Sequence, residues 1–136
     1  ARLTEGESKM GILEKAKPVV IICTRDRAKA VPFYRDTLGL PLVSEDAFAA
    51  VFALRDAVMR LSDVAGWTAH EHTIFGFEVG DISETVRRLS ANGLDFIRYP
   101  GFTQDADGVW ASPDGGAKVA WFKDPDGNTL SVSQHV

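Results

Sequence analysis

The sequence predicts an α+β fold made of two copies of one unit, in which a strand is followed by a helix and then by three strands. PVVIICT, residues 18–24, is rich in β-branched residues and begins with proline, as buried strands often do. A stretch with helical spacing follows it and ends at Gly39. The same order returns with the strand-like HTIFGFEV, residues 72–79, and a helical stretch that ends at Gly93. This repetition of pattern indicates an internal duplication.

In the first unit, Asp26 is the expected N-cap of a helix that contains Phe33, Tyr34 and Leu38. Pro32 lies inside that stretch, where its ring and its missing N–H disturb an α-helix, so we expect a late or irregular first turn. Short strands are expected near residues 41–45, 48–54 and 57–62.

The second unit has Asp81 or Ser83 as the expected N-cap of its helix. The apolar residues of this helix recur at helical spacing as Ile82, Val86 and Leu89. This unit is longer than the first by an extension near residues 101–116, which is rich in glycine and aspartate. Strands are expected near residues 95–100, 107–111, 117–123 and 129–134.

The sequence DPDG at residues 124–127 suits a type I turn that has proline at its second position and ends in a left-handed glycine. The resulting three-residue loop pairs Asp124 with Asn128, and counting outward sets Trp121 opposite Ser131. Cross-strand partners share a face of the sheet. One face is apolar and needs a helix against it: Ala120, Phe122, Leu130 and Val132. The other is mixed and suits the lining of a cavity: Val119, Trp121, Lys123, Thr129, Ser131 and Ser133.

Residues 57–62 and 73–79 alternate in the same way, so we expect a sheet that is cupped around a ligand pocket, with helices on its outer face. The chain has 136 residues, 45% of them apolar, which suits one domain over residues 16–136 with modules at about 17–65 and 72–135. Residues 1–15 are expected to be a tail, with added residues before a natural start at Met10.

The formal net charge of −4 gives no basic surface for nucleic acid or for an anionic membrane. No run of 18 apolar residues exists that would span a bilayer, and no signal peptide is visible at the start of the sequence. The lone Cys23 excludes an intramolecular disulfide. These features lead us to expect a cytoplasmic protein.

FYRDTLGL after the first strand and DPDGN before the last resemble motifs of the vicinal oxygen chelate superfamily, which includes glyoxalase I, extradiol dioxygenases and bleomycin resistance proteins. The ending GVWASPDGGAKVAWFKDPDGNTLSVSQ resembles an uncharacterised bacterial subgroup. The resemblance implies two βαβββ modules whose strands curl into a half-barrel around a central site. It also implies a small organic ligand and a homodimer. Fold-level resemblance alone does not name a substrate.

Metal-dependent members of the superfamily carry His and Glu ligands at four inward strand positions, which correspond to Val19, Arg60, Ile74 and Ser131. None of these four side chains is a good ligand for a divalent metal. The sequence therefore predicts that no metal cofactor is bound. The alternative is a displaced divalent metal held by the three histidines of the chain, His70, His72 and His135.

Seven residues are predicted to bind the ligand: Cys23, Arg60, Ser62, Trp110, Trp121, Ser131 and Ser133. A guanidinium holds carboxylate or phosphonate groups, tryptophan offers an aromatic wall, and serine donates hydrogen bonds. We therefore expect the ligand to carry an anionic or an aromatic group.

Each of these residues also has a purely structural interpretation. Arg60 would pair with Glu78 or another acid, or extend into solvent. The tryptophans would pack in the core, the serines would bond neighbouring groups or water, and Cys23 would be a small buried hydrophobe rather than a thiolate nucleophile.

These residues favour a metal-free protein that binds a small organic molecule. One alternative is a metal-dependent lyase, isomerase or dioxygenase with a non-standard ligand set. Another is an enzyme without metal, in which Arg60 holds an anion and His135 or Glu78 acts as a base. The sequence does not decide whether any reaction is catalysed.

Overall fold

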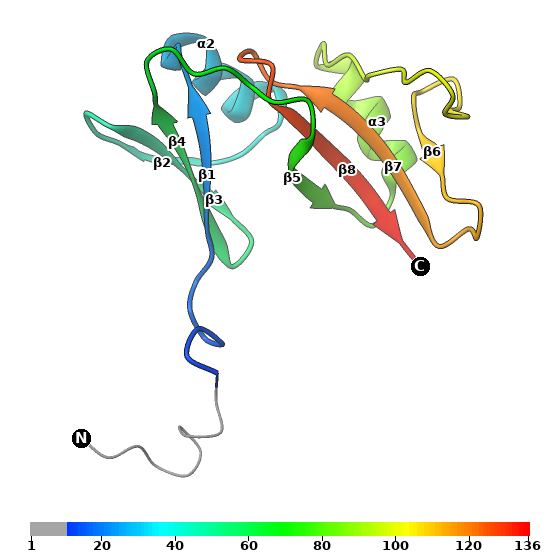
Figure 1. Cartoon of the computed structure of the whole chain (residues 1–136), viewed down its shortest axis with the longest axis horizontal. Coiled ribbons are helices and arrows are strands. Elements are labelled where there is room, and N and C mark those ends of the chain that lie inside the picture. Colours follow the sequence, from blue (N-terminus) through cyan, green and yellow to red (C-terminus); the bar gives the residue numbers. More distant parts are fainter. Residues whose placement is uncertain (1–10) are drawn as a thin grey trace.

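The computed structural model describes residues 11–136, which form two four-stranded sheets that lie side by side (Figure 1). The first sheet has the order β1-β4-β3-β2 and the second the order β5-β8-β7-β6. The first contains β1 (Val19–Thr24), β2 (Leu42–Glu45), β3 (Ala49–Leu54) and β4 (Ala57–Asp63). The second contains β5 (Thr73–Glu78), β6 (Trp110–Ala111), β7 (Ala117–Lys123) and β8 (Thr129–His135).

The two sheets repeat one topology, which confirms the predicted duplication and the α+β class. The first strand of each module pairs in parallel with the last strand, as β1 does with β4 and β5 with β8. The other pairings are antiparallel. Strand pairing does not continue from one sheet to the other within residues 11–136, so the expected half-barrel consists of two open sheets.

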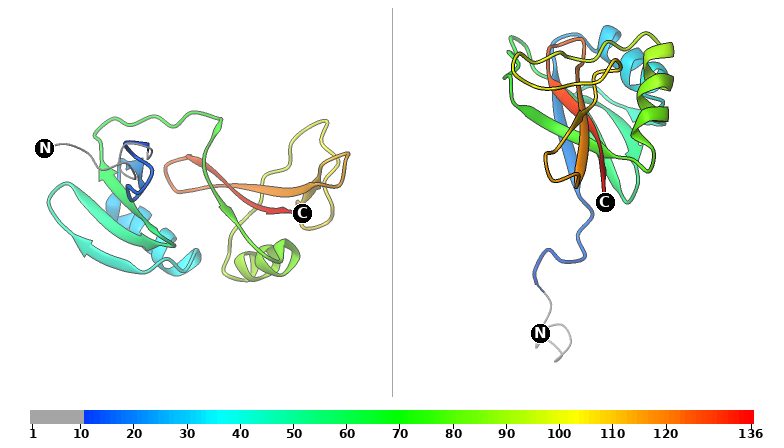
Figure 2. Two further views of the ribbon diagram at one scale, coloured as in Figure 1. Left: turned by 90° about the horizontal axis from the view of Figure 1, so that it is seen from below. Right: turned by 90° about the vertical axis from the view of Figure 1, so that its right-hand side faces the viewer.

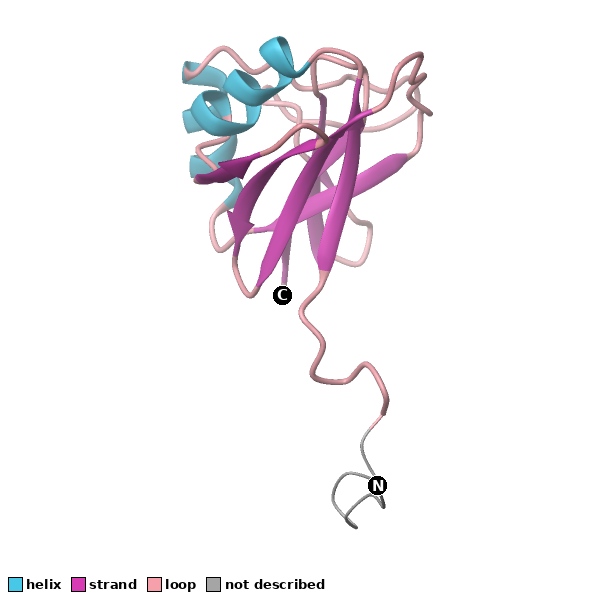
Figure 3. Cartoon of the chain, turned by 90° about the vertical axis from the view of Figure 1, so that its left-hand side faces the viewer, coloured by secondary structure: helices cyan, strands magenta, loops and turns pink. Residues whose placement is uncertain are grey.

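The helices are α2 (Arg27–Pro32), the π-helix η1 (Phe33–Thr37) and α3 (Ile82–Ala91). The side chains of Asp26 and Asp81 cap α2 and α3 by accepting hydrogen bonds from backbone N–H groups, as predicted. Pro32 is the last residue of α2, and the chain then widens into the π-helix. The helices lie together on one side of the sheets, which confirms the expected outer layer (Figure 3). In the described part of the chain, no helix has both the length and the apolar character needed to cross a membrane.

The hydrophobic core lies between the helices and the two sheets. Its β7 and β8 residues Ala120, Phe122, Leu130 and Val132 are all buried, as the alternation predicted. The register of this hairpin is also as predicted, with Trp121 opposite Ser131. Gly127 closes the turn with φ +86, a left-handed conformation that favours glycine.

The DPDGN turn fastens the two modules together. The buried Tyr34 hydroxyl donates to Asp124 Oδ2 at 2.6 Å, and the Asn128 side chain donates to the carbonyl of Cys23 at 3.0 Å. Asp126 Oδ1 accepts a hydrogen bond from the backbone N–H of Arg25 at 2.9 Å. Burial, reinforced by the Asp124 carboxylate, raises the pKa of Tyr34 far above its ordinary value, so its hydroxyl stays a donor. The turn therefore has a structural role.

The predicted strand at residues 95–100 is wrong. Phe96 forms an isolated bridge there with Phe122, and the backbone N–H of Ile97 donates to the carbonyl of Trp121 at 2.8 Å, but the segment does not continue as a strand. The Gln104 side chain accepts from the backbone N–H of Tyr99 and donates to the carbonyls of Ile97 and Gly108. These bonds take up backbone groups that a strand ladder would otherwise need, so a compact loop forms in place of the strand. The strand predicted at 107–111 shortens to β6 for the same reason.

Candidate functional site

We define the open face of each sheet as the face that points away from the helices. The open face of the first module consists of Val19, Ile21, Cys23, Val51, Val58, Arg60 and Ser62. Val19 is 52% exposed and Ile21 is 64% exposed. An apolar surface of this kind on a folded domain indicates a ligand or a partner.

Arg60 lies within this apolar face. Its neighbours along β4, Met59 and Leu61, are fully buried on the helix side, and its cross-strand partners are Ile21 and Val51. The nearest acid is Asp46, whose Oδ2 atom lies 3.8 Å from the Arg60 guanidinium. That distance allows only a weak, solvent-exposed ion pair, so most of the hydrogen-bonding capacity of the guanidinium remains available.

The Asp46 carboxylate bonds mainly to backbone groups of its own turn. Its Oδ1 atom accepts from the backbone N–H groups of Phe48 and Ala49 at 2.7 and 2.9 Å. These two bonds, followed by the charges of Arg60 and Arg27, lower the pKa of the Asp46 carboxyl.

Cys23 and Ser62 are neighbours on β1 and β4, next to each other in register, and both are half-buried. They lie one step along the strands from Ile21 and Arg60 on the same face. The structure therefore brings three of the predicted residues together in the first module.

The other four predicted residues lie on the open face of the second module. Trp121 pairs with Ser131, and Ser133 pairs with Val119, which in turn pairs with Trp110. All four are half-buried.

Gly76 completes the row that begins with Trp121 and Ser131, because it pairs with Ser131 on the other side. A Cβ atom at position 76 would lie only 2.5 Å from Ser131 Oγ. The serine hydroxyl thus occupies the space above this glycine.

Two aromatic residues that sequence reasoning missed, Tyr99 and Phe102, complete an aromatic cluster with the two tryptophans. The Tyr99 and Phe102 rings lie 5.4 and 5.8 Å from Trp121, and Phe102 lies 5.8 Å from Trp110. The tryptophan rings are 6.2 Å apart. The available signal was the Pro-Gly pair in YPGF, which is typical of a turn and presents the aromatic residues on either side of it.

Burial raises the pKa of Tyr99, and the nearby Glu71 carboxylate adds to the effect. This places an acidic group of the segment before β5 close to the aromatic cluster.

The seven predicted residues therefore form two groups on two sheets. Three inter-strand steps separate Arg60 on β4 from Trp121 on β7, in addition to the gap between β1 and β5. At about 4.8 Å per step, the separation along the sheets is about 14 Å plus that gap. One small ligand cannot touch both groups on a flat surface.

An apolar cavity of about 150 Å³ lies elsewhere, on the helix side of the second sheet. It is lined by Leu38, Leu40, Phe77, Val79, Thr85, Leu89, Phe122 and Val132. None of the predicted ligand residues lines it, so it is separate from the open faces.

The structure does not gather the three histidines. The rings of His70 and His72 stack with centroids 5.8 Å apart, just before β5 begins. His135 lies at the far end of β8, about 20 Å along the strand from Thr129, and its Nδ1 atom is 2.9 Å from Glu78 Oε1. Within residues 11–136, no three histidine, cysteine or acidic side chains are close enough together to hold a metal ion.

Comparison with known proteins agrees with this architecture. Residues 17–132 match the family model of the glyoxalase/bleomycin resistance protein/dioxygenase superfamily. The chain belongs to this superfamily. A search of curated proteins gave no match.

Solved structures of the superfamily share the fold at low identity. A lactoylglutathione lyase from Agrobacterium tumefaciens is 20% identical, with a TM-score of 0.68 over 88% of this chain and 93% of that one. A glyoxalase/bleomycin resistance protein/dioxygenase from Nocardioides is 18% identical, with a TM-score of 0.69 over 96% of this chain and 90% of that one. Similarity at this level supports the fold and leaves the activity open.

The superfamily includes metal enzymes, so the fit of a metal can be tested at the four corresponding positions. Val19 and Ile74 are partly exposed, at 52% and 36%, and carry no donor atom. Arg60 is a cation, and a serine hydroxyl such as that of Ser131 is a poor ligand. These side chains do not fit a divalent metal.

Proposed function

We propose that this chain is a metal-free small-molecule-binding protein of the glyoxalase/bleomycin resistance type, acting in the cytoplasm. The observation that carries the proposal is the chemistry of the open faces. At the four positions where metal-dependent relatives hold ligands, these faces present aliphatic, guanidinium and hydroxyl groups. Such groups bind an organic molecule by contact and by hydrogen bonds rather than by chelation.

We further propose that the protein works as a homodimer. The open face of the first module is bare, and Phe48 beside it is 76% exposed. A second copy of the chain would cover this surface and remove apolar area from water. It would also bring an open face of one subunit against an open face of the other, which would shorten the distance between the two groups of predicted residues.

Binding is tested by screening a fragment library against isotope-labelled protein and following backbone amide shifts. We expect several fragments to shift amides of β1, β4, β7 and β8. For fragments with a carboxylate, Arg60→Ala should weaken binding about tenfold, the loss expected for a charge-assisted bond. Arg55→Ala, which changes an arginine in the β3–β4 turn, is the matched control and should leave affinity unchanged. A library without any ligand for the open faces would refute the proposal.

Sedimentation at micromolar concentration tests the dimer. We expect twice the chain mass of 14.8 kDa for the wild type and the monomer mass for Ile21→Lys, which places a charge on the bare face. Val136→Lys, at the exposed C-terminus, should remain dimeric. A monomeric wild type under these conditions would contradict the dimer while leaving ligand binding open.

A further inference from the structure

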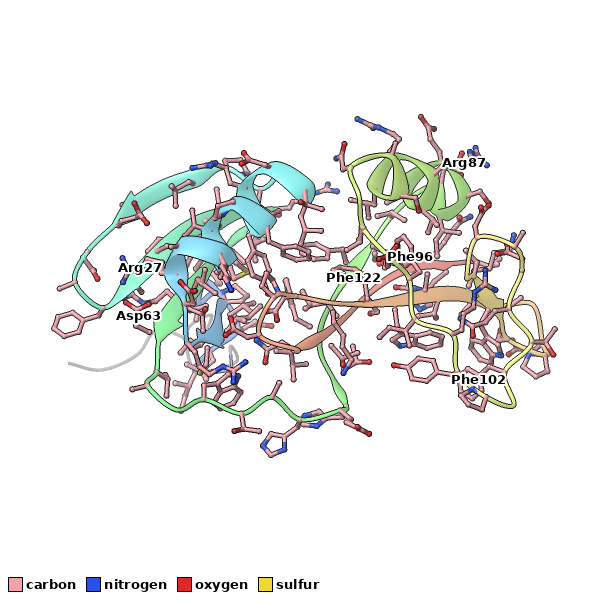
Figure 4. All side chains as sticks on the ribbon, turned by 90° about the horizontal axis from the view of Figure 1, so that it is seen from above. Arg27, Asp63, Arg87, Phe96, Phe102 and Phe122 are labelled. Atoms are coloured by element: carbon pink, nitrogen blue, oxygen red, sulfur yellow. The ribbon has the colours of Figure 1, made fainter. Side chains whose placement is uncertain are left out.

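We propose that the ligand carries a planar aromatic ring, and that this ring binds against an aromatic lobe on the open face of the second module. The aromatic lobe is residues 97–108, which carry Tyr99 and Phe102 and pack on Trp110 and Trp121. This inference rests on the proposed binding function and names the class of ligand. Figure 4 shows Phe102 on the side of β7 opposite to α3, the helix that carries Arg87.

The aromatic lobe is held in place before any ligand arrives. The amide of Gln104 makes three hydrogen bonds of 2.8 to 2.9 Å to backbone groups at both ends of the lobe. The guanidinium of Arg98 donates to the carbonyls of Asp105 and Ala106. Asp105 Oδ1 in turn accepts from the backbone N–H groups of Asp107 and Val109. A surface fixed in this way loses little conformational entropy when a ligand binds to it.

One ring of the lobe points partly into solvent. The turn from Tyr99 to Phe102 closes with a 3.2 Å hydrogen bond between their backbone groups, and Gly101 within it has φ +85. With proline at its second position, this is a type II turn, which requires such a glycine. The turn sets Phe102 against both tryptophans while leaving it 49% exposed. A large aromatic side chain that only filled a core would be buried.

Next to the aromatic lobe, the surface of the sheet carries small side chains, and we call this surface the floor. One row of it crosses β5, β8 and β7 and consists of Gly76, Ser131 and Trp121. Side-chain size increases along this row, from none at Gly76 to the large ring of Trp121. The next row contains Ser133 and Val119, which are also small. A flat ring can lie on such a floor with one edge or face against Trp121. The two serine hydroxyls can bond polar atoms at the rim of that ring.

The charges near the lobe are mixed. The Glu71 carboxylate is close enough to Tyr99 to raise its pKa, and Glu78 lies on the same face of β5 as Gly76 but contacts His135. The cationic Lys123 follows Trp121 on the open face of β7, so this mixture of charges favours a neutral aromatic ring. The guanidinium of Arg60 lies on the other sheet.

The experiment uses three pairs of neutral probes that differ in planarity but little in size: 2-naphthol, phenol and benzyl alcohol against decahydro-2-naphthol, cyclohexanol and cyclohexylmethanol. Binding to the full chain is measured from the indole N–H signals of its three tryptophans, each assigned with a Trp→Phe variant. We expect the aromatic probes to shift the signals of Trp110 and Trp121. The Trp67 signal is an internal control, because its Nε1–H donates to Asn128 at the junction of the modules.

Each aromatic probe should bind about threefold to tenfold more tightly than its saturated partner, which is the usual gain from an aromatic pair. Phe102→Ala should remove that preference, whereas Leu13→Ala, which shortens an exposed apolar side chain outside both open faces, should preserve it. Equal affinity for the saturated probes, or shifts confined to Trp67, would overturn the aromatic class. If none of the six probes binds while other library members bind the open faces, this inference fails and the proposed function stands. If nothing binds, both fail.

Discussion

The two modules share one topology on their helix side and differ on their open faces. On the helix side, each has an aspartate N-cap, Asp26 or Asp81, and a glycine with positive φ after its helix, Gly39 or Gly93. On the open side, the first module presents a bare apolar sheet around Arg60, and the second carries the aromatic lobe. Figure 2 shows the accompanying difference in the backbone: the first module has the β2–β3 hairpin, and the second has a long loop between α3 and β6.

This difference shows which parts of the duplicated fold are constrained by the shared core. The helix side must supply one shared core, so caps, helix ends and buried strand residues recur in equivalent places. Residues on the open faces do not pack in that core, so their loops and side chains can differ between the modules. We infer that the specific chemistry of the protein lies on the open faces and that the DPDGN turn belongs to the shared framework.

The largest expected effect comes from removing that framework. Asp124→Ala removes the acceptor of three buried donors, which are the Tyr34 hydroxyl and the backbone N–H groups of Asp126 and Asn128. It also removes one of the two acceptors of the Asn128 amide, which keeps its bond to the carbonyl of Cys23. At about 1–3 kcal/mol for a buried group left unsatisfied, we expect a loss of about 3 kcal/mol or more in the free energy of unfolding, measured in urea.

The exposed Asp95→Ala is the control and should change stability by less than about 0.5 kcal/mol. Because the turn joins the two modules, the Asp124→Ala substitution should lower the stability of both sheets together. A loss below about 1 kcal/mol would show that the turn is not what joins the modules.

A smaller effect is expected from the close approach on the open face of the second module. Gly76→Ala places a Cβ atom 2.5 Å from Ser131 Oγ, and we expect this overpacking to cost about 1–3 kcal/mol. Adding Ser131→Ala should remove most of that cost, because the atom in conflict is gone. The double-mutant cycle in urea measures this coupling, and purely additive effects would contradict the geometry.

The smallest effect is expected in the β2–β3 turn beside the open face of the first module, from Asp46→Asn. The pKa of Asp46 is lowered in the folded state, so its contribution to stability is present at neutral pH and is lost as pH falls through that lowered value. The amide of asparagine is a weaker acceptor for the N–H groups of Phe48 and Ala49 than a carboxylate. The variant should therefore melt slightly below the wild type at pH 7, with the gap closing in acid; a gap that persists in acid would be evidence against this role.

Local rules were enough to predict much of the fold. The DPDG turn determined the β7–β8 register, and the caps at Asp26 and Asp81 followed from the side chains alone. The segment at 95–100 was out of reach, because its shape depends on Gln104, a residue whose amide bonds both ends of the loop. Secondary-structure propensity cannot predict a loop whose two ends are held by one side chain.

The candidate site was predictable in part for a similar reason. Alternation placed Arg60, Trp121 and Ser131 on the open faces, since each strand has only two sides. It could not show that these residues lie on two separate sheets. Nor could it show that Tyr99 and Phe102 return to Trp121, because that contact depends on the path of the lobe.

The measurement that tests the central claim most directly is the metal content of protein purified without chelators, paired with thermal melts in added nickel, zinc, manganese or ferrous iron. If the open faces bind organic ligands without chelation, elemental analysis should find less than about one tenth of a metal ion per chain, and no metal should raise the melting temperature. Stoichiometric metal, with a melt that depends on it, would contradict the account and make His70, His72 and His135 the first residues to replace.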